Sequence, residues 1–93
     1  MYKIGSCFIL DVEGRRDLCA IKEIDKVNSE YTIECVSTSA NAGKQFVVSI
    51  GDLGQSADLN LGMHINFGEV VEDDKRIYYK RTKQSEAQPV AER

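Results

Sequence analysis

The sequence has no tryptophan, a single proline, a single histidine and only three cysteines among its 93 residues. Three cysteines are too few for the disulfide framework of a small secreted domain. No C-x-x-C pair accompanies the lone histidine, so we expect neither a zinc site nor another metal or cofactor. Without a disulfide framework, a reducing, cytoplasmic location is favoured.

Long apolar runs are also missing. No run approaches the ~20 apolar residues that span a bilayer. The apolar stretch at the N-terminus is short and is interrupted by Asp11 and Glu13, which is unlike a secretory signal. We therefore expect a small soluble protein that has no contact with a membrane.

Positive charge is scarce in the first three quarters of the chain. Residues 1–74 hold six basic and 13 acidic residues, a net of −7, whereas residues 75–93 hold six basic and two acidic residues, a net of +4. The two parts add to the overall charge of −3. An acidic body with a basic C-terminal part is consistent with a local polyanion contact, but it argues against wrapping by nucleic acid.

Apolar residues occur at every second position through most of the chain, which is typical of β-strands with one buried face. In the first such segment Ile4, Phe8, Leu10 and Val12 share the face that we expect to be buried. The strands that we expect are Ile4–Val12, Asp17–Asp25, Glu30–Ser37, Gln45–Ile50, Met63–Val71 and Arg76–Thr82. In the fifth of these, we expect Met63, Ile65 and Phe67 to face inward. The glycine-rich segment 51–62 predicts turns, and we expect Leu53, Leu59 and Leu61 to pack a short helical turn under the sheet.

Six short strands without a long helical period predict a single all-β domain over residues 1–82. The expected architecture is a small antiparallel barrel or half-open sandwich of five to six strands. The order of hairpin, tip loop, short turn and last strand resembles an SH3-like barrel, and an OB-like barrel is the second choice. Residues 83–93 are polar and hold the only proline, so we expect a disordered C-terminal tail.

The run Lys75–Lys83, KRIYYKRTK, has the only site-like composition in the chain. In a strand, Arg76, Tyr78 and Lys80 lie on one face, and Arg81 follows them. A tyrosine between cations could stack on a base while the cations meet phosphates, as in platforms for single-stranded nucleic acid. The candidate binding residues are therefore Arg76, Tyr78, Lys80 and Arg81.

The same run has two other interpretations. Lys and Arg on a terminal strand discourage aggregation at an exposed edge, with Ile77 and Tyr79 packed inward. Alternatively, an unpaired last strand could pair with its twin across a two-fold axis and form a dimer. In such a dimer, the cations of the last strand would pair with the acidic turn 72–74 of the second copy rather than with the turn of their own hairpin.

No other pattern points to chemistry. The acidic turn 72–74 lacks the EF-hand spacing for a hard cation, and we expect His64 to face outward with no nucleophile motif beside it. We therefore expect no catalytic residue and no enzyme, although a site built from loops is a third possibility. The favoured function is a non-enzymatic binding or adaptor module that contacts a protein or a second copy of itself through the last strand. The alternative is a nucleic-acid-binding module that uses residues 75–83.

Overall fold

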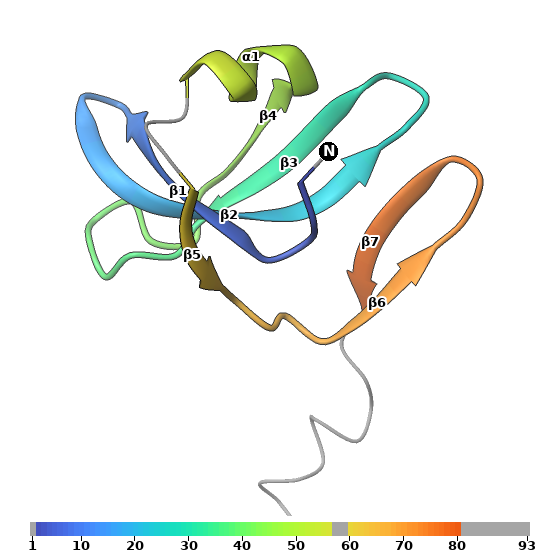
Figure 1. The fold of residues 1–93 in the computed structure, drawn as a ribbon. Helices are drawn as coiled ribbons and strands as arrows, with labels where there is room; N and C mark the ends of the chain where they lie inside the picture. Colours follow the sequence, from blue (N-terminus) through green and yellow to red (C-terminus); the bar gives the residue numbers. More distant parts are fainter. Residues whose placement is uncertain (1, 57–59, 81–93) are drawn as a thin grey trace, which may run out of the picture.

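The computed structural model describes residues 2–56 and 60–80 and shows strands packed into one curved sheet with one short helix (Figure 1). The elements are β1 (Ser6–Val12), β2 (Arg15–Asp25), β3 (Glu30–Cys35), β4 (Gln45–Ser49), α1 (Ile50–Ser56), β5 (Asn60–His64), β6 (Glu69–Glu72) and β7 (Arg76–Lys80). Within the described residues, no helix is long and apolar enough to cross a membrane.

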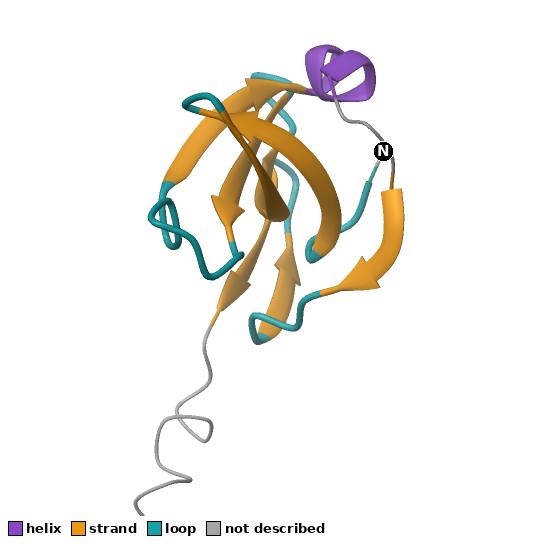
Figure 2. Ribbon diagram, turned by 90° about the vertical axis from the view of Figure 1, so that its left-hand side faces the viewer, coloured by secondary structure: helices purple, strands orange, loops and turns teal. Residues whose placement is uncertain are grey.

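All strand pairs are antiparallel, and the main order is β4-β3-β2-β1-β5. The long strand β2 pairs with β3 along one side. Along its other side it pairs first with β1 and then, over Glu23–Asp25, with β7. A bulge between Ile21 and Glu23 separates these two halves, and bulges bend a strand and increase its twist. Among the described strands the sheet is not closed, because β4 and β5 at the ends of this order are not paired with each other (Figure 2).

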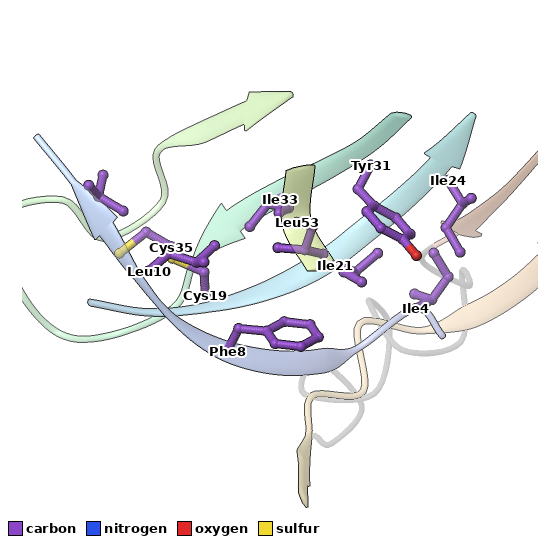
Figure 3. Packing of buried hydrophobic residues seen from close by; sticks show 11 residues of the cluster. Ile4, Phe8, Leu10, Cys19, Ile21, Ile24, Tyr31, Ile33, Cys35 and Leu53 are labelled. Carbon is purple, nitrogen blue, oxygen red and sulfur yellow. The ribbon is translucent and has the colours of Figure 1, made fainter. Parts of the chain in front are cut away.

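The core lies on the concave face of β1, β2 and β3 (Figure 3). The four residues of the first segment that were expected to be buried all belong to it, so that prediction is confirmed. Leu53 of α1 packs over them and is 1% exposed, as expected, whereas the side chains of Leu59 and Leu61 lie outside the described residues. The fully buried side chains are Tyr31, Phe8, Ile21, Ile24, Ile33, Leu53, Cys7, Cys19 and Cys35. Complete burial of a large apolar side chain stabilises a fold by about 1.5–3 kcal/mol, so these residues dominate its stability.

The three cysteines are free thiols inside the sheet. Cys19 and Cys35 lie directly opposite each other on β2 and β3. Burial, together with the neighbouring Cys35 thiol, raises the pKa of Cys19 to about 12. A thiol that stays protonated is a poor nucleophile, so Cys19 acts as a small core residue.

A buried polar pair anchors the loop between β3 and β4. Asp17 and Asn41 are each 4% exposed, and the Asn41 amide donates to an Asp17 carboxylate oxygen at 2.8 Å and to the Val12 carbonyl at 3.1 Å. The Ser37 hydroxyl donates to the other oxygen of Asp17 at 3.1 Å. These hydrogen bonds, the Asn41 bond foremost, hold the pKa of Asp17 below its usual range. The pair satisfies polar groups that would otherwise be buried without partners.

The all-β prediction is confirmed, but the described residues form seven strands where five to six were expected, and several strand boundaries differ by one or two residues. The expected strand Met63–Val71 is two strands, β5 and β6, which belong to different parts of the sheet. In the link between them, Asn66 accepts the Gly68 N–H at 3.0 Å, and Gly68 has φ +141°, a conformation that favours glycine and interrupts the expected strand. Met63, expected to face inward, is 48% exposed. The predicted tail and the boundary after residue 82 lie outside the described residues.

Candidate functional site

The strand that holds the candidate residues is not a free edge. β7 pairs with β2 through Arg76–Tyr78 and with β6 through residues 77–80. The assumption that the last strand is an unpaired edge was therefore wrong. The bulge in β2 lies directly before its last three residues, and these pair with β7 rather than with β1. The outer strand of this hairpin is β6.

Arg76, Tyr78 and Lys80 lie on one face of β7, as the alternation predicted, and Arg81 lies outside the described residues. The Arg76 guanidinium lies 4.5 Å from the centre of the Tyr78 ring and 3.3 Å from a carboxylate oxygen of Glu23 on β2. Lys80 stands opposite Glu69 of β6 in the strand register. The cations of β7 are therefore set among carboxylates, which weakens their attraction for phosphate. Their role in binding stays a prediction.

The acidic turn between β6 and β7 uses its carboxylates within the molecule. An Asp73 carboxylate oxygen accepts the backbone N–H groups of Arg76 at 2.9 Å and Lys75 at 2.8 Å, and these bonds hold the pKa of Asp73 below its usual range. The Lys26 ammonium lies 3.1 Å from Glu72 and donates to the Asp73 carbonyl at 2.9 Å. These bonds fix the hairpin tip against the turn between β2 and β3. Over residues 2–56 and 60–80 no group of His, Cys, Asp and Glu is arranged to hold a metal ion.

The opposite face of β7 packs against the body, as expected for Ile77 and Tyr79. The centres of the Tyr79 and Phe67 rings are 5.1 Å apart, and the Lys22 ammonium lies 4.9 Å from the centre of the Tyr79 ring. Lys22 also bonds Glu34 at 2.8 Å. The hairpin is thus attached by apolar contacts on one face and by the ion pair between Arg76 and Glu23 on the other.

A groove of about 340 Å³ opens between this hairpin and the N-terminal segment. Its lining residues are Tyr2, Lys3, Ile4, Ile24, His64, Val70, Glu72 and Ile77. Most of these side chains are apolar, and Val70 of β6 is 53% exposed. Sequence reasoning missed this groove because its lining comes from five separate segments that meet only in the folded sheet.

The N-terminal wall of the groove is held tightly. Gly5 donates to the Ile21 carbonyl at 2.7 Å and accepts the Ile65 N–H at 2.8 Å, and a ring nitrogen of His64 lies 2.7 Å from the Ile4 carbonyl. Gly5 has φ +91°, and a Cβ there would meet the Ile65 carbonyl and the His64 ring. Only glycine fits at this position of the wall.

β6 presents an open edge beside the groove. The Asp73 N–H donates to the Arg76 carbonyl, so residues 73 and 76 form a hydrogen-bonded pair. Such pairs alternate along an antiparallel ladder, and the next one joins Val71 to Tyr78. The backbone groups of Val70 and Glu72 therefore point away from β7. Among the described residues β6 pairs with β7 alone, so these groups face the open side.

No protein-family model matches the chain, and comparisons with curated proteins and with solved structures give no match either. The resemblance to an SH3-like or OB-like barrel therefore stays a prediction. The functional argument rests on the groove and on the edge of β6.

Proposed function

We propose that this domain is a non-enzymatic, cytoplasmic binding module that takes up an extended segment of a partner protein along β6. The observation that carries the proposal is the coincidence of an open strand edge with an apolar groove on the same hairpin. The edge offers main-chain hydrogen bonds, and the groove offers a place for side chains. Addition of a strand to a sheet edge uses these two features together. The three free thiols support a reducing compartment.

The geometry also sets the chemistry of the segment. A strand that bonds the backbone of Val70 and Glu72 places the side chains opposite them on the same face as the side chains of those two residues, which line the groove. An apolar side chain opposite Val70 would enter the groove among Ile4, Ile24 and Ile77. A basic side chain opposite Glu72 would share with Lys26 a carboxylate that is 66% exposed. The favoured ligand is therefore an extended peptide with an apolar and a basic residue two positions apart.

This proposal keeps the last hairpin as the contact region and transfers the contact from β7 to β6. The nucleic-acid alternative has less support, because Arg76 is paired with Glu23 and Lys80 faces Glu69. A carboxylate beside each cation repels a phosphate backbone. Binding through phosphate contacts would weaken steeply as salt rises. We expect a fluorescent oligothymidine to show no such salt-dependent binding.

The experiment is selection of a random peptide display library on the immobilised domain, followed by titration of the selected peptides. We expect sequences that alternate apolar and basic residues. Val70→Lys, which places a charge in the groove, should weaken their binding by about tenfold or more, a change of about 1.4 kcal/mol. Val27→Lys is the matched control, because Val27 is 67% exposed in the turn after β2 and does not line the groove.

Proline substitutions distinguish the two edges of β6, one open and the other bonded to β7. Val70→Pro removes an N–H that points to the open side, so the fold should survive while peptide binding is lost. Val71→Pro removes an N–H that bonds β7 and should destabilise the hairpin itself. Selected peptides that bind Val70→Lys and Val70→Pro as well as the wild type would overturn the proposal. Binding abolished by Arg76→Ala with Lys80→Ala alone would return the contact to β7.

A further inference from the structure

A second open edge, separated from β6 by three strands, belongs to β4. The strand QFVVS carries no charge and no proline, and it pairs with β3 over five consecutive residues without a bulge. We propose that two copies of this chain pair through β4 across a two-fold axis centred on Val47, forming a dimer with one continuous sheet. This inference is independent of the proposed function.

The backbone of β4 is arranged for such pairing. Cys35 donates to the Lys44 carbonyl and Ile50 donates to the Ser29 carbonyl, so hydrogen bonds to β3 fall on the even-numbered residues of the strand. The N–H and C=O groups of Gln45, Val47 and Ser49 therefore point to the side away from β3. Among the described residues β4 pairs with β3 alone, so this side has no neighbouring strand.

Space lies beside the start of this edge. A groove of about 230 Å³ separates the end of β1 from the start of β4, and the Lys44 ammonium bridges it to Glu13 at 2.7 Å. The last residues of β4 lie beyond this bridge and run toward α1 (Figure 1). The unpaired groups of Val47 and Ser49 are therefore not covered by β1.

A two-fold register centred on Val47 is self-consistent. Val47 would exchange both backbone bonds with Val47 of the second copy, and Gln45 would do so with Ser49 of the second copy. On the outer face the two Val47 side chains, each 56% exposed in the single chain, would cover each other. On the inner face Phe46 would stand opposite Val48 of the second copy, and both already pack against the core. Aromatic and β-branched cross-strand pairs of this kind stabilise sheets.

The chemistry of the edge favours a second copy as its occupant. Sheet edges that stay single are commonly guarded by lysine, proline or a bulge, and β4 has none of these. The edge of β6 carries two glutamates, so its composition does not suit pairing with itself. Three strands, β3, β2 and β7, lie between β4 and β6. The dimer would therefore present two binding grooves at the far ends of its sheet, which increases avidity for a repeated partner.

The test is a charge-swap pair at the axis. Sedimentation equilibrium of the wild type should give a dimer mass that falls to the monomer mass on dilution. Val47→Lys and Val47→Glu place like charges opposite each other and should each be monomeric at concentrations where the wild type is dimeric. An equimolar mixture of the two variants should recover the dimer. Val27→Lys, the same change at another exposed valine, should leave the dimer intact.

Each other outcome contradicts the proposal. A wild type that stays monomeric up to about 1 mM would remove self-association altogether. Rings or larger assemblies, or a mixture that does not recover the dimer, would indicate pairing of β4 with another strand such as β5. Circular dichroism of both variants establishes that they are folded, and peptide binding at β6 provides a separate readout that the charge swap should not change.

Discussion

The body of the sheet and the hairpin β6–β7 are held by different forces. Strands β1, β2 and β3 with α1 supply every side chain that is fully buried in the described residues. No described residue of 69–80 is buried, and Ile77, Tyr78 and Tyr79 of β7 are only partly covered. Three paired residues of β2, ion pairs and the Phe67–Tyr79 contact attach the hairpin.

This difference separates stability from binding. Burial of apolar surface is the dominant favourable term in folding, so the body determines whether the chain folds. The hairpin contributes less to that term and leaves apolar side chains and backbone groups open on β6. Segments that bind partners are commonly drawn from the less stable parts of a domain. Substitutions in the two regions should therefore have unequal effects on unfolding, and four predictions test this inequality.

The largest effect is expected in the body. Phe8→Ala should lower the free energy of unfolding by about 3–5 kcal/mol, because it leaves a cavity in the core. Ile77→Ala in the hairpin should lower it by about 1 kcal/mol, within the range of ordinary substitutions. Urea denaturation of both variants measures the difference. Equal losses in the two variants would show that the hairpin is part of the same core.

A smaller effect is expected at the polar anchor of the body. Asn41→Ala leaves the buried Asp17 carboxylate and the Val12 carbonyl without their donor, and should cost about 1–3 kcal/mol. Asn28→Ala is the matched control, because its amide bonds Asp25 at an exposed turn. That change should stay within about 0.5 kcal/mol. Urea denaturation measures both losses. Equal losses of unfolding free energy in the two asparagine variants would contradict the anchoring role of Asn41.

The pH dependence of the anchor follows from the lowered pKa of Asp17. A carboxyl group whose pKa is lower in the folded state stabilises the fold above its unfolded pKa of about 3.9. This stabilisation is lost as pH falls through the folded pKa. Asp17→Asn should therefore be less stable than the wild type at pH 7, and the gap should narrow below about pH 4. Thermal unfolding at pH 7 and pH 3 measures the gap; a gap that widened in acid would contradict the assignment.

The smallest effect is expected at the exposed ion pairs of the hairpin. Arg76→Ala removes a bond to Glu23 that is open to solvent, and such pairs contribute about 0–1 kcal/mol. The midpoint of urea unfolding should hardly move, and added salt should reduce the difference further. A loss comparable to that of Phe8→Ala would show that the ion pairs, rather than β2, hold the hairpin in place.

The same contrast explains how far the sequence predicted the structure. Alternation in the first segment follows from a buried face, so Ile4, Phe8, Leu10 and Val12 could be identified by period alone. In β2 the bulge breaks the alternation, so period alone does not place Ile24 in the same core cluster as Cys19 and Ile21. The hairpin could not be placed in this way. Its position depends on the bulge in β2 and on the turn at Gly68, which are irregularities of one residue that periodicity does not reveal. The face shared by Arg76, Tyr78 and Lys80 was predicted correctly, whereas the groove depends on contacts between distant segments.

Amide hydrogen exchange along β6, measured by NMR with and without a selected peptide, tests the central claim most directly. In the free domain, the amides of Val70 and Glu72 should exchange quickly, while the Val71 amide, bonded to β7, should be protected. Saturation with peptide should protect Val70 and Glu72 and leave exchange in the rest of the hairpin little changed. Protection of Val70 and Glu72 in the free monomer, or unchanged exchange at saturation, would contradict the account.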